Sequence, residues 1–319
     1  MKAITSRESA LALRVAARAT LRYLESSSGW EKLAQVEGVF HSGDAPIRAD
    51  QEAHRVFDRT VRTSSENLGD SIYAVVGEEL IQPLPHSYEP GVRLIVVDPL
   101  DGSTQWSLIH SVFCVAAYCL VADQNGELKM ESAVVANPQH CFTWLANKTG
   151  FEVGLTRQDG ESDWNTLDVI PEGTMSAPSI AFTGFKPKDR KALLDIAETL
   201  ADWHILTLGG NPVTPYVVTG GLTAAVTLRP QAAWDALGIL MASRSNAVVG
   251  ALDGTILDPP TFESLFTRVV LEGNVRRIPA LVVAKSEARY HEIVESLSPH
   301  VSDDLHLSGP MPIPPILPK

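Results

Sequence analysis

The first part of the chain carries two kinds of hydrophobic pattern. Apolar residues recur at helical spacing over 8–25 and over 50–68, with Asp50 as the predicted N-cap of the second helix. Runs of apolar or β-branched residues predict strands at 72–76, 92–97, 112–122, 128–136, 141–146 and 151–155. Asn125-Gly126 lies between two of these runs and is a hairpin signal. Helices followed by a meandering sheet indicate an α+β arrangement.

The pattern changes after a polar, irregular stretch at 156–178. Strands are predicted at 179–183, 204–208, 223–228 and 280–284, and helices at about 187–201, 212–219, 234–247 and 286–296. This alternation is typical of an α/β fold. We therefore expect an N-terminal α+β half over 1–155, a C-terminal α/β half over 156–308, and a Pro-rich tail over 309–319.

Composition narrows the classes of function. A net charge of −12 over 319 residues disfavours nucleic-acid binding, which needs a basic footprint, but it is compatible with a site that binds cations. The three cysteines have neither zinc-site nor disulfide-framework spacing, so a cytoplasmic protein is expected. Arginines interrupt the apolar N-terminal segment, which argues against a signal peptide, and no uncharged run is long enough to span a membrane.

The most informative segment runs from Val96 to Thr104 and places two carboxylates, Asp98 and Asp101, after a hydrophobic strand. Pro99 lacks an N–H group, so the strand is predicted to end there. Gly102 permits a tight turn, after which Ser103 and Thr104 can begin a helix whose free N–H groups would face an anion. Two acids beside an anion-binding turn conflict electrostatically unless a divalent cation lies between them and a phosphate.

Two further acidic segments accompany this one. Gly77-Glu78-Glu79 follows the short strand at 72–76, and Trp234-Asp235 opens a predicted helix far downstream. A plainer interpretation is also possible, because Asp-Pro and Asp-Gly are common turn sequences and each of the other acids could be an ordinary surface residue.

The three acidic motifs, in this order, resemble the inositol monophosphatase family of lithium-sensitive phosphatases, to which fructose bisphosphatase is related. The resemblance extends from about Asp50 to Gly254. It implies a layered α-β-α-β-α sandwich and a site that binds two or three Mg²⁺ ions, for which Mn²⁺ can substitute. The all-oxygen donor set, with no His or Cys, fits Mg²⁺ better than Zn²⁺.

The resemblance also implies roles for individual residues. The metal ligands would be Glu78, Asp98, the carbonyl of Leu100, Asp101 and Asp235. The catalytic residues would be Glu78, Ser103 and Asp101, with Glu78 and Ser103 orienting the attacking water. Phosphate would bind at Gly102, Ser103 and Thr104. Asp50 and Glu79 would lie behind the ligands or near a weaker third metal.

Three features depart from the family pattern. The family carries a Glu shortly before its Trp-Asp motif that contacts sugar hydroxyls, and here the candidates for that position are Thr227, Leu228 and Arg229. The run Trp234-Asp235-Ala236-Leu237-Gly238 is one residue shorter before its glycine than the family's, and Asn211-Pro212 replaces a small alanine-like pair that lines the substrate. Gly210, Asn211 and Arg229 are therefore the candidates for substrate recognition. Arg229 could bind a second phosphate or a carboxylate, although a solvated strand end is the plainer interpretation.

The expected activity is Mg²⁺-dependent hydrolysis of a small-molecule phosphate monoester by a metal-activated water. The expected partner is a small phosphorylated metabolite, with neither nucleic acid nor membrane involved, and the resemblance implies a homodimer. One alternative is a phosphatase for 3′-phosphoadenosine 5′-phosphate or another bisphosphate. An alternative of another class is a catalytically inactive relative that binds metal or ligand.

Overall fold

The computed structural model describes residues 4–26, 48–64, 66–77, 84–85, 87–103, 106, 113–146, 151–155, 164–167, 177–183, 190–208, 210–211, 213–272 and 277–300. A first sheet contains seven strands in sequence order: β1 (Ile72–Val76), β2 (Arg93–Asp101), β3 (Cys114–Ala122), β4 (Leu128–Ala136), β5 (His140–Leu145), β6 (Phe151–Leu155) and β7 (Trp164–Leu167). β1 pairs with β2 in parallel, and the later pairs are antiparallel. The predicted meander is confirmed, whereas β7 lies in a stretch that was predicted to be irregular.

The second sheet has the order β11-β12-β10-β8-β9. Its strands are β8 (Ser179–Thr183), β9 (His204–Thr207), β10 (Ala224–Thr227), β11 (Val248–Ala251) and β12 (Leu281–Ala284). β8 pairs in parallel with both β9 and β10, and β12 is antiparallel to both of its neighbours. The sheet is therefore mixed, and its parallel part arises from the predicted alternation of strands and helices.

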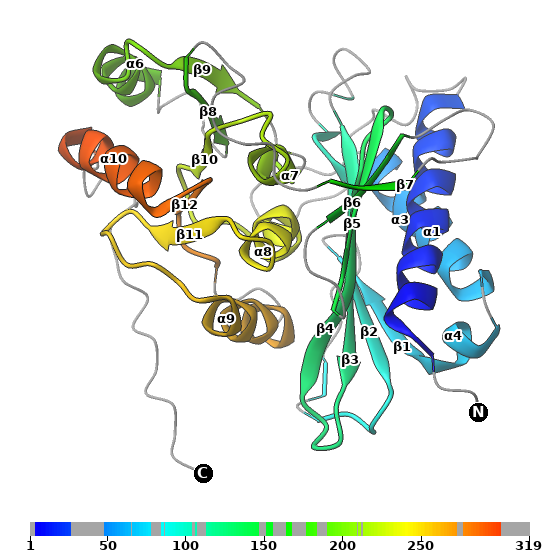
Figure 1. Cartoon of the computed structure of the whole chain (residues 1–319). Helices are drawn as coiled ribbons and strands as arrows, with labels where there is room; N and C mark the ends of the chain where they lie inside the picture. The colour runs from blue at the N-terminus through cyan, green and yellow to red at the C-terminus, as the bar shows by residue number, and fades with distance from the viewer. Residues whose placement is uncertain are drawn as a thin grey trace.

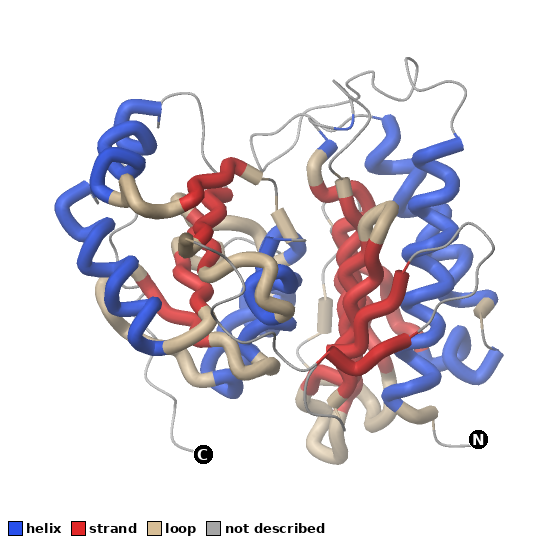
Figure 2. Tube along the Cα trace, turned by 45° about the horizontal axis from the view of Figure 1, so that its top comes forward, coloured by secondary structure: helices blue, strands red, loops and turns tan. Residues whose placement is uncertain are grey.

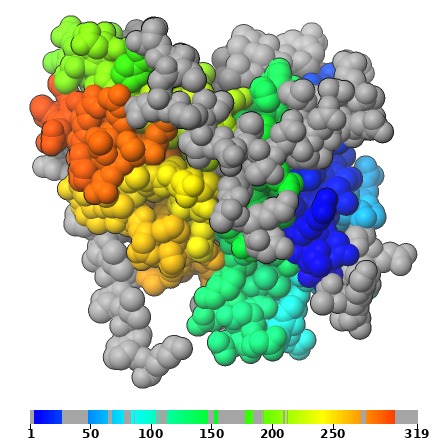
Figure 3. All heavy atoms as spheres, viewed as in Figure 1, coloured from blue at the N-terminus to red at the C-terminus, as the bar shows by residue number. Residues whose placement is uncertain are grey.

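Helices cover both sheets in layers (Figures 1 and 2). α1 (Ser6–Ser26) and α3 (Arg48–Thr63) cover the outer face of the first sheet, with the short α4 (Glu66–Ser71) beside them. α7 (Val213–Val218), α8 (Leu237–Ser243) and α9 (Pro259–Leu271) lie between the two sheets. α6 (Arg190–Thr199) and α10 (Glu287–Leu297) cover the far face of the second sheet, so that α1 and α10 lie on opposite sides of the molecule (Figure 3). The expected α-β-α-β-α sandwich is confirmed.

Burial of the first sheet on both faces explains its continuous apolar runs. Leu94 and Val96 of β2 pack in the core between the first sheet and the central helices, whereas Ile95 and Val97 pack beneath α1 and α3. A strand that faces solvent on one side would alternate polar and apolar residues instead.

The central helix α8 is buried all round. Every residue from Leu237 to Ser243 is buried, as expected for a helix between two sheets. A short 3₁₀ turn, η2 (Trp234–Ala236), leads directly into α8 and contacts β2. The central layer therefore brings the Trp-Asp motif against the first sheet.

Several predicted element boundaries were wrong. The helix predicted over 50–68 ends at Thr63, and a separate helix, α4, follows it. Asp50 lies within α3 and is buried, so it is not the N-cap. α9 and β11 were not predicted, and the helix predicted over 234–247 consists of η2 and then α8. None of the described helices combines the length and hydrophobicity that a membrane span requires.

An ion pair is buried within the first sheet. Nη2 of Arg93 lies 2.7 Å from Oε1 of Glu131, and Nε donates to Oε2 at 2.8 Å. Both side chains are buried. Removing one partner of such a pair leaves the other charge desolvated, whereas an apolar pair of similar volume can be as stable.

We expect Arg93→Leu to lower the free energy of unfolding by about 3–5 kcal/mol, because Glu131 would remain buried without its partner. The double variant Arg93→Leu/Glu131→Leu should recover most of this loss. Lys129→Leu, which removes an exposed partner of Glu127, serves as a control and should change stability by less than about 1 kcal/mol. Urea unfolding measures all three, and a double variant less stable than Arg93→Leu would contradict the assignment.

Candidate active site

An irregularity at the end of β2 places two carboxylates on the same face of the sheet. Asp98 is the register partner of Ala116, and Asp101 is that of Cys114, so β2 advances three residues while β3 advances two. Side chains three apart on a regular strand point to opposite faces, but one extra residue restores the same face. Pro99 lies inside this bulge, where a missing N–H group is tolerated. The strand therefore continues to Asp101, and the prediction that it ends at Pro99 was wrong.

The face that carries both carboxylates is the one covered by the central helices, because Cys114 and Ala116 belong to the core on that side. Asn211, just before α7, meets them there. Its backbone N–H donates to Oδ2 of Asp101, and its side-chain Nδ2 lies 3.4 Å from Oδ2 of Asp98. One residue of the central layer thus contacts both acids.

The same asparagine contacts the Trp-Asp motif. Nδ2 of Asn211 donates to the carbonyl of Trp234 at 2.9 Å, and Oδ1 accepts from the N–H of Gly238 at 2.8 Å. Asp235 lies between Trp234 and Gly238 in the sequence, and its Oδ2 accepts a hydrogen bond from the N–H of Ala232 at 3.3 Å. The motifs that are distant in sequence therefore meet around Asn211.

Two glycines make this close approach possible. Gly210 has φ +49°, and a Cβ there would lie 1.9 Å from Oδ2 of Asp101. A Cβ on Gly238 would lie 2.2 Å from the carbonyl oxygen of Asn211. Any side chain at either position would have to displace the carboxylate or the asparagine.

Burial raises the pKa of the Asp101 carboxyl above its usual range, although hydrogen bonds from Asn211 and Cys114 act in the opposite direction. The Sγ of Cys114 lies 3.7 Å from Oδ2 of Asp101. Burial, followed by the negative charges of Asp101 and Asp98, raises the pKa of the Cys114 thiol well above its usual range. Cys114 is therefore a neutral neighbour of the acids, which its place in an apolar run did not reveal.

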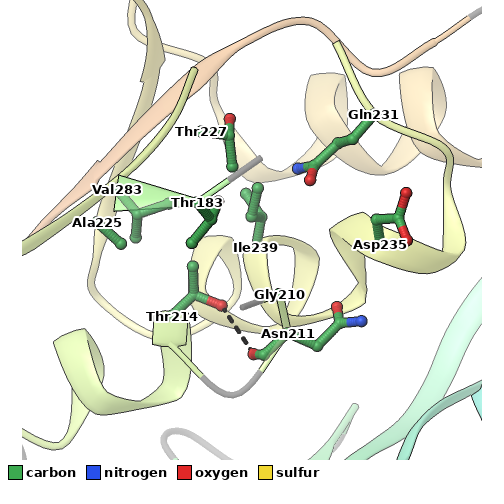
Figure 4. Close-up of a pocket in the computed structure, with 10 residues that line it drawn as sticks. All are labelled: Thr183, Gly210, Asn211, Thr214, Ala225, Thr227, Gln231, Asp235, Ile239 and Val283. Carbon is green, nitrogen blue, oxygen red and sulfur yellow. Dashed lines mark hydrogen bonds between the residues drawn. The ribbon is translucent and has the colours of Figure 1, made fainter. Parts of the chain in front are cut away.

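A small cavity of about 10 Å³ lies beside Asp235, which is room for about one water (Figure 4). Six polar residues line it together with apolar ones: Thr183, Asn211, Thr214, Thr227, Gln231 and Asp235. Thr183 and Gln231 were not predicted as site residues, whereas Thr227 was one of three candidates for a position that contacts substrate hydroxyls. The positions of Thr183 and Thr227 could have indicated a site, because these residues end the adjacent parallel strands β8 and β10.

The remaining candidates have different positions. Gly102, at φ +91°, and Ser103 follow Asp101, and the N–H of Trp106 donates to the carbonyl of Gly102 at 2.9 Å, as in a first helical turn. Arg229 lies beyond the end of β10 and is partly exposed. Glu78, Glu79 and Thr104 lie outside the described residues.

The residues before Glu78 can be placed. A Cβ on Gly77 would lie 2.4 Å from the carbonyl oxygen of Val97 and 3.3 Å from Nδ1 of His54, so the chain passes directly beside the residue before Asp98. Asp50 lies one turn before His54 on α3 and is buried. Asp50 and the start of the Gly-Glu-Glu motif therefore approach the same end of β2.

The donors at this end of β2 fit a hard cation. Two carboxylates and the Leu100 carbonyl lie within four residues on one strand end, and burial already disfavours the charged form of Asp101. A cation of the Mg²⁺ type prefers such oxygen donors and would offset their charge. Within the described ranges, no three His, Cys, Asp or Glu side chains form a metal-binding cluster. Glu78, which the resemblance assigns as a ligand, falls outside those ranges.

The sequence matches no protein-family model and no curated protein significantly. Solved structures do share the fold. The extragenic suppressor protein SuhB from Bartonella henselae aligns with a TM-score of 0.65 at 16% identity, over 92% of this chain and 99% of that one. The IMPase from Thermotoga maritima gives 0.61 at 17% identity, over 91% and 96%. An IMPase/NADP phosphatase complexed with Mg²⁺ and phosphate gives 0.55 at 14% identity, over 82% and 85%.

The chain therefore has the fold of the inositol monophosphatase family, as the order of its acidic motifs predicted. At these identities the comparison concerns the fold, and the assignment of ligands and substrate depends on the residues themselves.

We expect Gly210→Ala to displace the carboxylate of Asp101 and to weaken binding of Mn²⁺ by about tenfold or more, because an outer-shell change typically costs 10–100-fold in metal affinity. Titration followed by electron paramagnetic resonance measures the affinity. Gly254→Ala is the matched control, since Gly254 also has positive φ (+91°) but open space around its missing Cβ. Equal Mn²⁺ affinities in the two variants would contradict the prediction.

Proposed function

We propose that this protein is a Mg²⁺-dependent phosphatase that hydrolyses a phosphate monoester of a small soluble metabolite. The observation that carries the proposal is the meeting of Asp98, Asp101 and the Trp234-Asp235 turn around a single asparagine. Surface turns would have no reason to converge in this way. The fold supports the same conclusion, because one structure that shares it is an IMPase/NADP phosphatase with Mg²⁺ and phosphate bound.

The proposed role of the strand end is to hold the metal. Asp98, Asp101 and the Leu100 carbonyl supply oxygen donors from β2, and Asp235 supplies one from the central layer. When bound, Mg²⁺ would lower the pKa of a water and neutralise charge on the phosphoryl group. We propose that the site binds two or three ions and that Mn²⁺ can substitute for Mg²⁺. Glu78 would be a metal ligand, and Glu79 would lie behind the ligands.

The proposed role of the turn after Asp101 is to hold the phosphate. The hydrogen bond from Trp106 to Gly102 is that of a helix start, where the preceding N–H groups have no partner within the helix. Such groups at Gly102, Ser103 and Thr104 would donate to phosphoryl oxygens. The Ser103 hydroxyl, together with Glu78, would orient the attacking water in line with the leaving oxygen. The acids thus hold the cation, and the turn holds the anion.

The substrate is proposed only as a small phosphorylated molecule. Gly210, Asn211 and Arg229 stay candidates for its recognition, and Asp50 stays a candidate for an outer-shell or third-metal residue. A homodimer, which the resemblance implies, and a cytoplasmic location, which the cysteine pattern suggests, stay predictions as well.

The proposal is tested by Mg²⁺-dependent release of phosphate from a panel that includes inositol, sugar, nucleoside 3′- and bisphosphate esters. We expect Asp98→Asn and Asp235→Asn each to reduce kcat/KM for the best ester by more than about 100-fold, since loss of a ligand should exceed the effect of losing an outer-shell partner. The fold should persist, because the substituted amides have nearly the same shape.

Asp70→Asn provides the control, because Asp70 is an exposed acid on α4, remote from the carboxyl end of β2. It should retain full activity. Full activity in either Asp98→Asn or Asp235→Asn would contradict the ligand assignment. Binding of Mn²⁺ without turnover of any ester would favour an inactive, metal-binding relative instead.

A further inference from the structure

Asn211 is the residue through which the two groups of acids are connected. It is 1% exposed, and its side chain lies below Asp235 and extends away from Thr214 (Figure 4). The side chain contacts β2 on one side and the η2–α8 turn on the other. A buried asparagine in such a position must satisfy its polar atoms internally.

All polar groups of Asn211 have partners within this junction. The backbone N–H donates to Asp101, and the backbone carbonyl accepts from the Thr214 hydroxyl at 3.4 Å. Nδ2 has two acceptors, the Trp234 carbonyl and Oδ2 of Asp98, while Oδ1 has one donor, the Gly238 N–H.

The orientation of the amide is determined by this set of partners. Gly238 offers an N–H donor and Trp234 a carbonyl acceptor, so a flipped amide would face a donor with a donor and an acceptor with an acceptor. Asn211 therefore holds one defined distance between β2 and the turn that carries Asp235.

We propose that Asn211 is a positioning residue that sets the location of Asp235 relative to Asp98 and Asp101, and thereby the affinity of the site for its divalent cation. This inference rests on the proposed function, because it assumes that these acids bind metal. It assigns Asn211 to the support of the acids, whereas the sequence suggested a contact with substrate.

Asn211→Ala removes both side-chain bonds to the turn and the donor to Asp98. We expect its affinity for Mn²⁺ to fall by about 10–100-fold, the range typical of lost outer-shell partners. The KM for ester at saturating Mg²⁺ should change much less, because every polar group of Asn211 already has a partner within the junction. Electron paramagnetic resonance of Mn²⁺ alone provides a measurement that is independent of turnover.

The variant Asn211→Asp distinguishes a positioning role of this residue from a purely electrostatic one. It keeps the acceptor for Gly238 but loses the donors to Trp234 and Asp98, and it adds a negative charge. A positioning role predicts weaker Mn²⁺ binding in this variant too, whereas a position that mattered only for its charge would bind the cation more tightly. Tighter or unchanged binding in Asn211→Asp would overturn the inference.

Asn137→Ala is the matched control. Asn137 is also a buried asparagine, and its Nδ2 donates to the Tyr216 hydroxyl of α7 at 3.0 Å, so it too connects the first sheet to the central layer. It should lower thermal stability comparably while keeping the Mn²⁺ affinity of the unsubstituted chain. An equal loss of affinity in Asn137→Ala and Asn211→Ala would mean that general loosening is responsible and would overturn the inference.

Measurements on the unsubstituted chain show whether the proposed function or only the positioning role of Asn211 fails. If it binds no Mn²⁺ and hydrolyses no ester, the proposed function fails and the inference fails with it. If it binds Mn²⁺ and Asn211→Ala binds it equally well, the proposed function stands and the positioning role alone is rejected.

Discussion

One extra residue in β2 determines the geometry of the site. Without the bulge between Asp98 and Asp101, the period of two along a strand would direct one carboxylate beneath α1 and α3 and the other toward the central helices. A desolvated carboxylate in the apolar layer beneath α1 and α3 would be severely destabilising. With the bulge, both acids face the same layer, where an asparagine, a thiol and the Trp-Asp turn can contact them. The convergence of the distant motifs depends on this local irregularity.

The fold buries the acidic end of β2, where the ionised form of a carboxylate is disfavoured. The acids face the central layer, and the raised pKa of Asp101 shows that burial disfavours its ionised form. Such an arrangement is unfavourable for the empty protein and favourable for one that binds a cation, because the ion would offset the desolvated charge. At the other end of β2, the charges of the buried residues Arg93 and Glu131 compensate each other in an ion pair.

The layered fold could be predicted because its hydrophobic signals are strong. The strand at 179–183 and the helix over 8–25 were found because burial imposes a clear period or an unbroken apolar run on each. β11 was missed because Gly250 interrupts its short apolar run, which directly follows a predicted helix. α9 begins with two prolines after Asp258, whose carboxylate accepts from the N–H of Thr261. Those are N-terminal helix signals that were present but not used.

The residue types of the site could be predicted from the sequence, but the contacts between its segments could not. The order of acidic motifs identified the segments that meet, yet Pro99 was taken as a strand end, because a bulge that tolerates proline depends on register with β3. Asp50 was taken as an N-cap, whereas it lies on the buried side of α3. Likewise, no local pattern identifies Asn211, since its partners lie 23, 27, 110 and 113 residues away along the chain.

Two of the expected departures from the family pattern, at Asn211 and in the run that ends at Gly238, are in contact in the structure. Gly238 lies so close to Asn211 that a Cβ there would overlap the backbone carbonyl of the asparagine, whose side-chain Oδ1 accepts a hydrogen bond from the Gly238 N–H. Gly210 has to lack a side chain because Asp101 occupies that space. Positions 210, 211 and 238 are therefore coupled, and a substitution at one of them changes what the other two can accept.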